Sequence, residues 1–160
     1  GFKYIAKEML SKEVLIGGEE SGGIGFGSHI PERDALFTTL VLLEAISKGG
    51  KPLGQRLDDL QCKYGKIYYD RIDLNLGKIS YRKRFEDFLK TNSIDSVAGH
   101  AVKETSCLDG VKFRLNRNHW LMFRFSGTEP LLRIYSEAPS QKEVQKTIQW
   151  AKELVQEQCM

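Results

Sequence analysis

Two segments in the second half of the chain alternate apolar and polar residues, a pattern typical of half-buried β-strands. They are residues 120–125 and 131–136. Two earlier segments, residues 99–105 and 110–115, also have strand-like composition, and short turn-like stretches connect neighbouring segments. Because short connections imply antiparallel neighbours, the pattern predicts a four-stranded antiparallel sheet.

Apolar residues at helical spacing predict two helices beside this sheet. One covers residues 80–91, and the other follows Ser140, which forms a capping box with Glu143. Residues 66–75 resemble an extended connector. Since a sheet buries one face under helices, we expect both helices on one face.

Residues 1–65 show a different order of elements. The pattern predicts a helix over residues 2–10, then a short strand over 13–17 that is buried on both faces. A largely apolar helix begins at Pro31, and another covers residues 52–64. This order resembles one unit of an α/β domain, and one unit is too small to close its own sheet. We therefore predict an α+β chain: a partial α/β unit in residues 1–65, with more chain expected beside it, followed by a domain in 66–160.

Composition narrows the class of protein. The 160 residues are 41% hydrophobic and 28% charged, which is typical of a globular chain. Residues 66–160 carry 16 Lys and Arg against 12 Asp and Glu, an excess too small and too interspersed to predict nucleic-acid binding. The three cysteines have no metal-like spacing and suit a reducing, cytoplasmic location. No apolar run approaches the roughly 20 residues of a membrane span.

Residues 124–130 (RFSGTEP) connect the last two predicted strands and have the composition of an anion site. Glycine lets backbone N–H groups converge on an anion, hydroxyls add donors, and arginine offers a planar fork to phosphate oxygens. Arg124, Ser126 and Arg133 fall on the polar faces of their strands, whereas Glu129 would oppose an anion. Composition alone leaves a phosphate loop and a simple hairpin turn equally open.

Residues 18–23 (GEESGG) follow the first predicted strand, where α/β folds place ligand loops. Their carboxylates and hydroxyl suit sugar hydroxyls, acid–base work or a metal, but spacing alone favours a solvated acidic turn. The surrounding glycines lack the spacing of a dinucleotide-binding motif.

Other polar residues are interpreted as structural. Arg33 and Asp34 are predicted to be surface charges in the first turn of the helix that begins at Pro31. His100 and His119 are lone histidines beside strands, and the basic run at residues 81–84 is typical of a solvated helix face. The cysteines receive no role.

Taken together, the two loops at 18–23 and 124–130 resemble those of the α-D-phosphohexomutases, the phosphoglucomutase/phosphomannomutase family. The resemblance extends over essentially the whole chain, including residues 1–3 and 27–34, and it identifies the chain with most of domain 3 and all of domain 4. It implies that Glu19, Ser21 and Arg33 contact the sugar. It also implies a phosphate-binding set: Arg124, Ser126, Gly127, Thr128 and Arg133.

The resemblance further implies an isomerase that moves a phosphoryl group between a phosphoserine and the 1- or 6-hydroxyl of a hexose. Mg²⁺ and a hexose 1,6-bisphosphate activator would serve the parent enzyme. The family's phosphoserine loop and metal loop are not in this sequence, so we expect no catalytic residue, no metal ligand and no turnover here. Both loops would belong to N-terminal domains of the same polypeptide. The GEES form of the sugar loop leans towards glucose, and a stand-alone sugar-phosphate-binding module remains the alternative.

Overall fold

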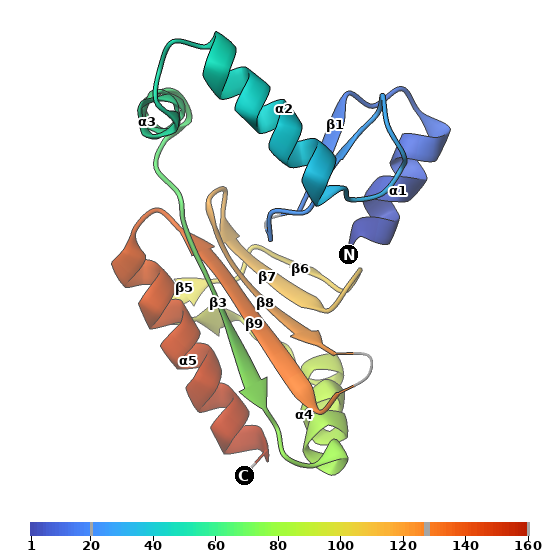
Figure 1. Cartoon of the computed structure of the whole chain (residues 1–160). Helices are drawn as coiled ribbons and strands as arrows, with labels where there is room; N and C mark the ends of the chain where they lie inside the picture. The colour runs from blue at the N-terminus through green and yellow to red at the C-terminus, as the bar shows by residue number, and fades with distance from the viewer. Residues whose placement is uncertain (20, 127–128, 160) are drawn as a thin grey trace. The chain divides into compact units, whose positions relative to one another are not determined.

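A computed structural model describes residues 1–19, 21–126 and 129–159 of the chain (Figure 1). The chain divides into two compact units, Gly1–Asp59 and Leu60–Met160. Among the described residues, no helix is long and apolar enough to cross a membrane.

The second unit is built on an antiparallel sheet with the strand order β3-β9-β8-β7-β6. The α+β class is therefore confirmed, but this sheet has five strands where the sequence pattern predicted four. The bounds of its strands are as follows: β3 Tyr68–Asn75, β6 Glu104–Ser106, β7 Val111–Asn116, β8 His119–Phe125 and β9 Leu131–Ala138.

The additional strand is β3, which the sequence interpretation treated as a connector. Its residues pair antiparallel with β9 from Tyr68 opposite Ala138 to Asn75 opposite Leu131. Ile72 pairs with a buried β9 residue and packs against the core. The sequence pattern did not predict this strand because several of its residues are charged. An edge strand of an antiparallel sheet needs only one apolar face, so such residues are compatible with it.

The predicted strand at 99–105 is broken in two. Its first part, β5 (His100–Ala101), pairs with β4 (Ser96–Val97) in a separate hairpin. Ala98 and Gly99 form the turn with φ of 50° and 85°. Because the chain reverses here, only β6 continues into the main sheet.

Helices α4 (Ile79–Thr91) and α5 (Gln141–Cys159) cover one face of this sheet, as predicted. Phe85 of α4 and Ala151 of α5 pack with Leu121 and Phe123 of β8 in one buried cluster. Since side chains alternate along a strand, Arg124 lies on the opposite face of the sheet.

The start of α5 confirms half of the predicted capping box. The Ser140 hydroxyl accepts a hydrogen bond from the backbone N–H of Glu143 at 3.2 Å. The Glu143 carboxylate bonds the His100 ring at 2.8 Å. In a capping box, the Glu143 carboxylate would accept from the backbone N–H of Ser140. Here it bonds His100 of the β4–β5 hairpin instead.

The described residues before β3 form helices and a short hairpin: α1 (Phe2–Ser11), β1 (Ile16–Gly18), β2 (Ile24–Phe26), α2 (Ala35–Lys48) and α3 (Leu53–Tyr64). The boundary between the two units falls within α3. Strand β1 pairs antiparallel with β2 and nothing else in the described chain. The prediction of a strand buried on both faces is therefore wrong here, and Leu15 is 87% exposed.

Helix α2 begins at Ala35 and not at Pro31. Asp34 is its N-cap, and its carboxylate accepts from the Phe37 N–H at 2.9 Å. This cap satisfies a donor of the first turn and fixes where the helix starts. Helix α2 has no buried residue, and Leu36 is 81% exposed, so the expectation of a helix buried in a larger core is not met within this chain.

Candidate functional site

Two arginines lie directly opposite each other in neighbouring strands of the second unit. Arg124 of β8 is the register partner of Arg133 of β9. Opposed residues in an antiparallel pair have Cβ atoms about 4.5–5.5 Å apart, and like charges so placed repel each other. The strand register therefore concentrates positive charge beside the loop that joins β8 to β9.

Each arginine is balanced by a different acid. Arg124 Nη2 lies 3.3 Å from Asp109 Oδ2, and Arg133 Nε lies 3.8 Å from Asp73 Oδ2. Asp109 stands on the turn between β6 and β7, and Gly110 follows it with φ of +113°. A Cβ on Gly110 would lie 2.3 Å from the carbonyl oxygen of Phe123, so the turn can approach β8 only with glycine there.

Arg133 also presents an unsatisfied donor. Its Nε is buried and has no hydrogen-bond partner among the residues that the structure describes. A buried donor without a partner costs about 1–3 kcal/mol, which is why such groups are rare unless a ligand or water completes them. The Asp73 carboxylate, 3.8 Å away, is too far to satisfy this donor with a hydrogen bond.

The base of the loop is closed by backbone bonding. Ser126 is 6% exposed, and its N–H donates to the carbonyl of Leu131 at 2.9 Å. Glu129 is exposed. Gly127 and Thr128, which the family resemblance assigns to phosphate binding, lie outside the described residues.

The sequence interpretation missed Arg82 of α4. Its Nη1 donates to the carbonyl oxygen of Ser126, and its Nε pairs with Glu86 at 3.0 Å. The guanidinium also lies over the ring of Phe125, 5.5 Å from its centre. The prediction of a solvated helix face is wrong for this residue. The one sequence signal for this contact is the spacing of Arg82 and Glu86, because opposite charges four residues apart on a helix can pair.

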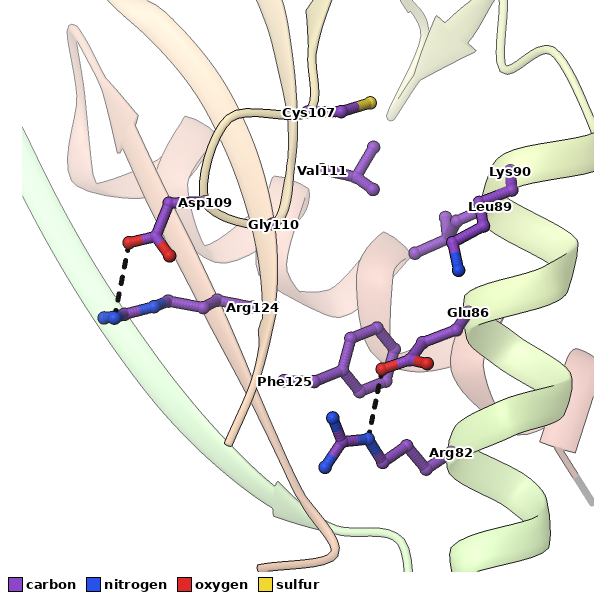
Figure 2. A pocket seen from close by; sticks show the side chains of 10 residues that line it. All are labelled: Arg82, Glu86, Leu89, Lys90, Cys107, Asp109, Gly110, Val111, Arg124 and Phe125. Carbon is purple, nitrogen blue, oxygen red and sulfur yellow. Dashed lines mark hydrogen bonds and ion pairs between the residues drawn. The ribbon is translucent and has the colours of Figure 1, made fainter. Parts of the chain in front are cut away.

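A pocket of about 330 Å³ lies between α4 and the end of β8 (Figure 2). Phe125 points towards α4, whereas Arg124 reaches Asp109 on the neighbouring turn (Figure 2). Both strand residues line the pocket with Arg82, so the loop base, α4 and the β6–β7 turn meet at one place.

In the first unit, the structure brings Glu19 and Arg33 together. Arg33 Nη1 lies 3.3 Å from Glu19 Oε2, and the Glu19 side chain is 13% exposed. A Cβ on Gly23 would lie 2.5 Å from Arg33 Cδ and 3.0 Å from Glu19 Oε2, so glycine makes room for this pair. Ser21 is exposed in the same loop, and Glu20 lies outside the described residues.

Arg33 does not sit in the first turn of α2, as predicted, but just before the helix. Its backbone N–H donates to Glu32 at 2.7 Å and lowers the pKa of that carboxyl, with a further contribution from its side chain. Asp34 is held by the Phe37 N–H and then by His29, which both lower the pKa of Asp34. These contacts fix the backbone that presents Arg33 to Glu19.

The two histidines of the second unit are ordered side chains. His119 is 1% exposed, and its Nε2 lies 2.9 Å from the Thr147 hydroxyl. Burial, and then the charge of His100, lower the pKa of His119. The hydrogen bond from His100 lowers the pKa of Glu143.

The described chain thus consists of a first unit of helices with a short hairpin and a second unit built on a five-stranded antiparallel sheet, which defines a two-domain α+β architecture. Residues 1–64 match the family model of the phosphoglucomutase/phosphomannomutase alpha/beta/alpha domain III, and residues 83–151 match that of the C-terminal domain. The chain belongs to the phosphoglucomutase/phosphomannomutase family, which confirms the resemblance seen in the two loops.

Similar proteins carry several mutase names. A Thermococcus kodakarensis phosphoglucomutase/phosphomannomutase is 29% identical and covers 98% of this chain. A Brevibacillus brevis phosphoglucosamine mutase is 30% identical and covers 100%. The crystal structure of a Thermus thermophilus protein assigned as a phosphomannomutase superposes with a TM-score of 0.72 at 35% identity over 98% of this chain. This chain spans 32%, 31% and 30% of those proteins, respectively.

Proposed function

We propose that this chain supplies the phosphate and sugar contacts of a phosphohexomutase that interconverts hexose 1-phosphate and hexose 6-phosphate. The opposed pair of Arg124 and Arg133, with the unsatisfied Nε of Arg133, is the observation that supports it best. A phosphate dianion placed between the two guanidiniums would relieve their repulsion and accept from that donor.

In this proposal the arginines grip the phosphate that is not being transferred. Phosphate oxygens would replace the carboxylates of Asp109 and Asp73 as partners of the guanidiniums. Ser126, Gly127 and Thr128 would add donors, as the family resemblance implies. Holding one end of the sugar places the other end for reaction, and the positive charge offsets that of the substrate.

The loop of the first unit would read the sugar. A carboxylate accepts hydrogen bonds from hydroxyls, so Glu19 is proposed to bind sugar hydroxyls with Ser21 and Arg33 beside it. The ion pair with Arg33 keeps the Glu19 carboxylate in place. We propose glucose as the preferred hexose on the GEES form of the loop, with glucosamine and mannose as the sugars to compare.

Transfer itself is proposed to need groups that this sequence does not contain. A phosphoserine, Mg²⁺ and a hexose 1,6-bisphosphate would act in N-terminal domains of the same polypeptide, in the cytoplasm. We therefore expect the 160 residues alone to bind substrate without turning it over. Measurable mutase activity of the purified chain would contradict this part of the proposal.

An NMR titration of the ¹⁵N-labelled chain tests the phosphate site. We expect inorganic phosphate and glucose 6-phosphate at millimolar concentration to shift the amides of residues 125–129 and Arg133, whereas glucose shifts none of these. Because the phosphate group of either ligand would bind the same donors at the loop, inorganic phosphate and glucose 6-phosphate should shift the same amides. If these amides stay still while others move, the phosphate assignment is wrong.

The contact from Arg82 predicts a positioning role for this residue. Arg82→Met keeps the apolar stem but removes the donor to the Ser126 carbonyl, so the loop loses one charge-assisted hydrogen bond, worth about 1.5–3 kcal/mol. Because this bond orders the loop and does not contact the phosphate, only part of its loss should reach binding, and we expect phosphate affinity to fall about twofold to tenfold in the same titration. Arg84→Met, an exposed neighbour with the same change of charge, is the control and should leave the affinity unchanged. Equal losses in both variants would show a general charge effect and contradict the positioning role.

A further inference from the structure

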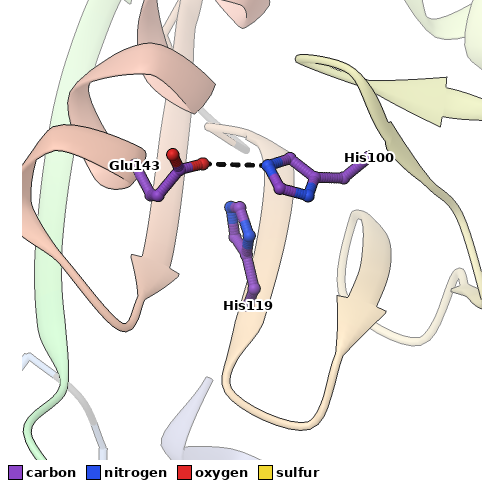
Figure 3. Close-up of side chains that lie close together, drawn as sticks. All are labelled: His100, His119 and Glu143. Carbon is purple, nitrogen blue, oxygen red and sulfur yellow. Dashed lines mark hydrogen bonds and ion pairs between the residues drawn. The ribbon is translucent and has the colours of Figure 1, made fainter.

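Three side chains that are far apart in the sequence meet on the second unit. His100 comes from β5, His119 from β8 and Glu143 from the first turn of α5 (Figure 3). One nitrogen or oxygen atom of each lies within 4.8 Å of the other two. His100 Nε2 and Glu143 Oε2 are already 2.8 Å apart, and the two imidazole rings are 4.8 Å apart at their centres.

The group has one fixed member and two adjustable ones. The ring of His119 is buried and held by the hydroxyl of Thr147, which is itself buried. His100 and Glu143 are about one-third exposed, so their side chains can rotate and the cluster remains open to solvent. The backbone of Glu143 is anchored by the Ser140 cap, which limits how far its carboxylate can move.

This set of side chains has the chemistry of a transition-metal site. Two imidazoles and one carboxylate with an open fourth position are ligands that suit Zn²⁺, at about 2.0–2.2 Å from the ion. Ligand atoms on one such tetrahedral ion lie roughly 3–3.5 Å apart. A modest rotation of the two exposed side chains would reach that spacing from the present cluster.

We propose that His100, His119 and Glu143 bind a divalent transition-metal ion of the Zn²⁺ type, with water at the remaining position. This site departs from the expectation that the chain holds no metal. It lies in the same unit as the arginine pair but uses different residues, so it is independent of the proposed phosphate site. The competing explanation is structural: the hydrogen bond between His100 and Glu143 serves only to attach the β4–β5 hairpin to α5.

One nearby charge opposes a cation. Lys146 follows Glu143 on α5, and its positive charge acts on both His119 and Glu143. The proposal therefore predicts that Lys146→Gln tightens metal binding, because it removes a repulsion and no ligand. If the hydrogen bond between His100 and Glu143 is only structural, the chain should bind no metal at this place, and Lys146→Gln should have no effect on metal binding.

Co²⁺ is the probe for the test, since its visible absorption reports coordination and Zn²⁺ should displace it. The full chain is used with Cys62→Ser and Cys107→Ser, because both thiols are exposed and could bind metal themselves. We expect one Co²⁺ per chain, with visible bands that Zn²⁺ removes. Loss of an outer-sphere partner of a metal ligand typically weakens affinity 10–100-fold, so loss of a ligand should weaken it at least tenfold.

Single substitutions decide whether this cluster is the site. His100→Asn and Glu143→Gln change side chains that are about one-third exposed. Each should weaken Co²⁺ binding at least tenfold and leave the far-ultraviolet circular dichroism spectrum unchanged. His29→Asn is the matched control, because His29 also pairs with a carboxylate, that of Asp34, but has no second histidine. The proposal is overturned if the parent chain binds no Co²⁺ at millimolar concentration. Unchanged binding in both cluster variants, or weaker binding in Lys146→Gln, would overturn it equally.

Discussion

Arg124→Ala should remove most of the phosphate affinity of the chain. Arg124 is the charged donor beside the loop, and hydrogen bonds to charged groups contribute about 1.5–3 kcal/mol. We therefore expect the phosphate dissociation constant to rise about tenfold to a hundredfold in the NMR titration. In the longer mutase that we propose, the same change should lower both substrate affinity and turnover, since a poorly held phosphate leaves the reacting end misplaced.

Two further variants make this result specific. Arg114→Ala removes the same charge from the same face of the sheet. Because Arg114 pairs with Glu104 on the edge strand, this variant should leave the phosphate affinity nearly unchanged. Asp109→Asn removes the acid that balances Arg124, so phosphate should bind more tightly. If Arg114→Ala weakens binding as much as Arg124→Ala, only the net charge matters and the role of Arg124 is refuted.

Alternation along the strands was enough to predict which face Arg124 and Arg133 occupy. A period of two fixes the face of every residue once one buried residue is known. Their direct opposition was not predictable, because it depends on the register that the loop and the sheet set together. The acids that balance them were hidden for a similar reason: Asp109 comes from a turn, and Asp73 comes from the segment that was interpreted as a connector.

The remaining differences also arise from contacts over long distances in sequence. Arg82 sits in a basic run that looks like a solvated face, and only the packing of α4 against β8 brings it to the Ser126 carbonyl. Likewise, the capping box at Ser140 was recognisable, but its glutamate bonds a histidine 43 residues away. Local patterns predict the helices and the loop composition, whereas the partners of charged side chains depend on tertiary structure.

Phe85→Ala should cause a large loss of stability in the second unit. Phe85 is fully buried, and its ring packs edge-on against Phe123 and Phe125 of β8. Truncating a buried phenylalanine typically costs about 3–5 kcal/mol, because contacts are lost and a cavity remains. Urea unfolding followed by tryptophan fluorescence measures this unit directly, since Trp120 and Trp150 both lie in it and the chain has no other tryptophan.

This loss should also reach the loop between β8 and β9, which we propose binds phosphate. Phe85 lies one turn after Arg82 on α4, so the ring that anchors the helix to β8 also holds the arginine against the Ser126 carbonyl. Phe88→Ala is the matched control, because Phe88 stacks on Phe85 from the same helix but is only partly buried. We expect Phe88→Ala to cost clearly less free energy of unfolding and to leave phosphate affinity within about twofold, the low end of one hydrogen bond. If Phe85→Ala costs less than about 1 kcal/mol, α4 is not anchored through this ring, and the link from core packing to the loop fails.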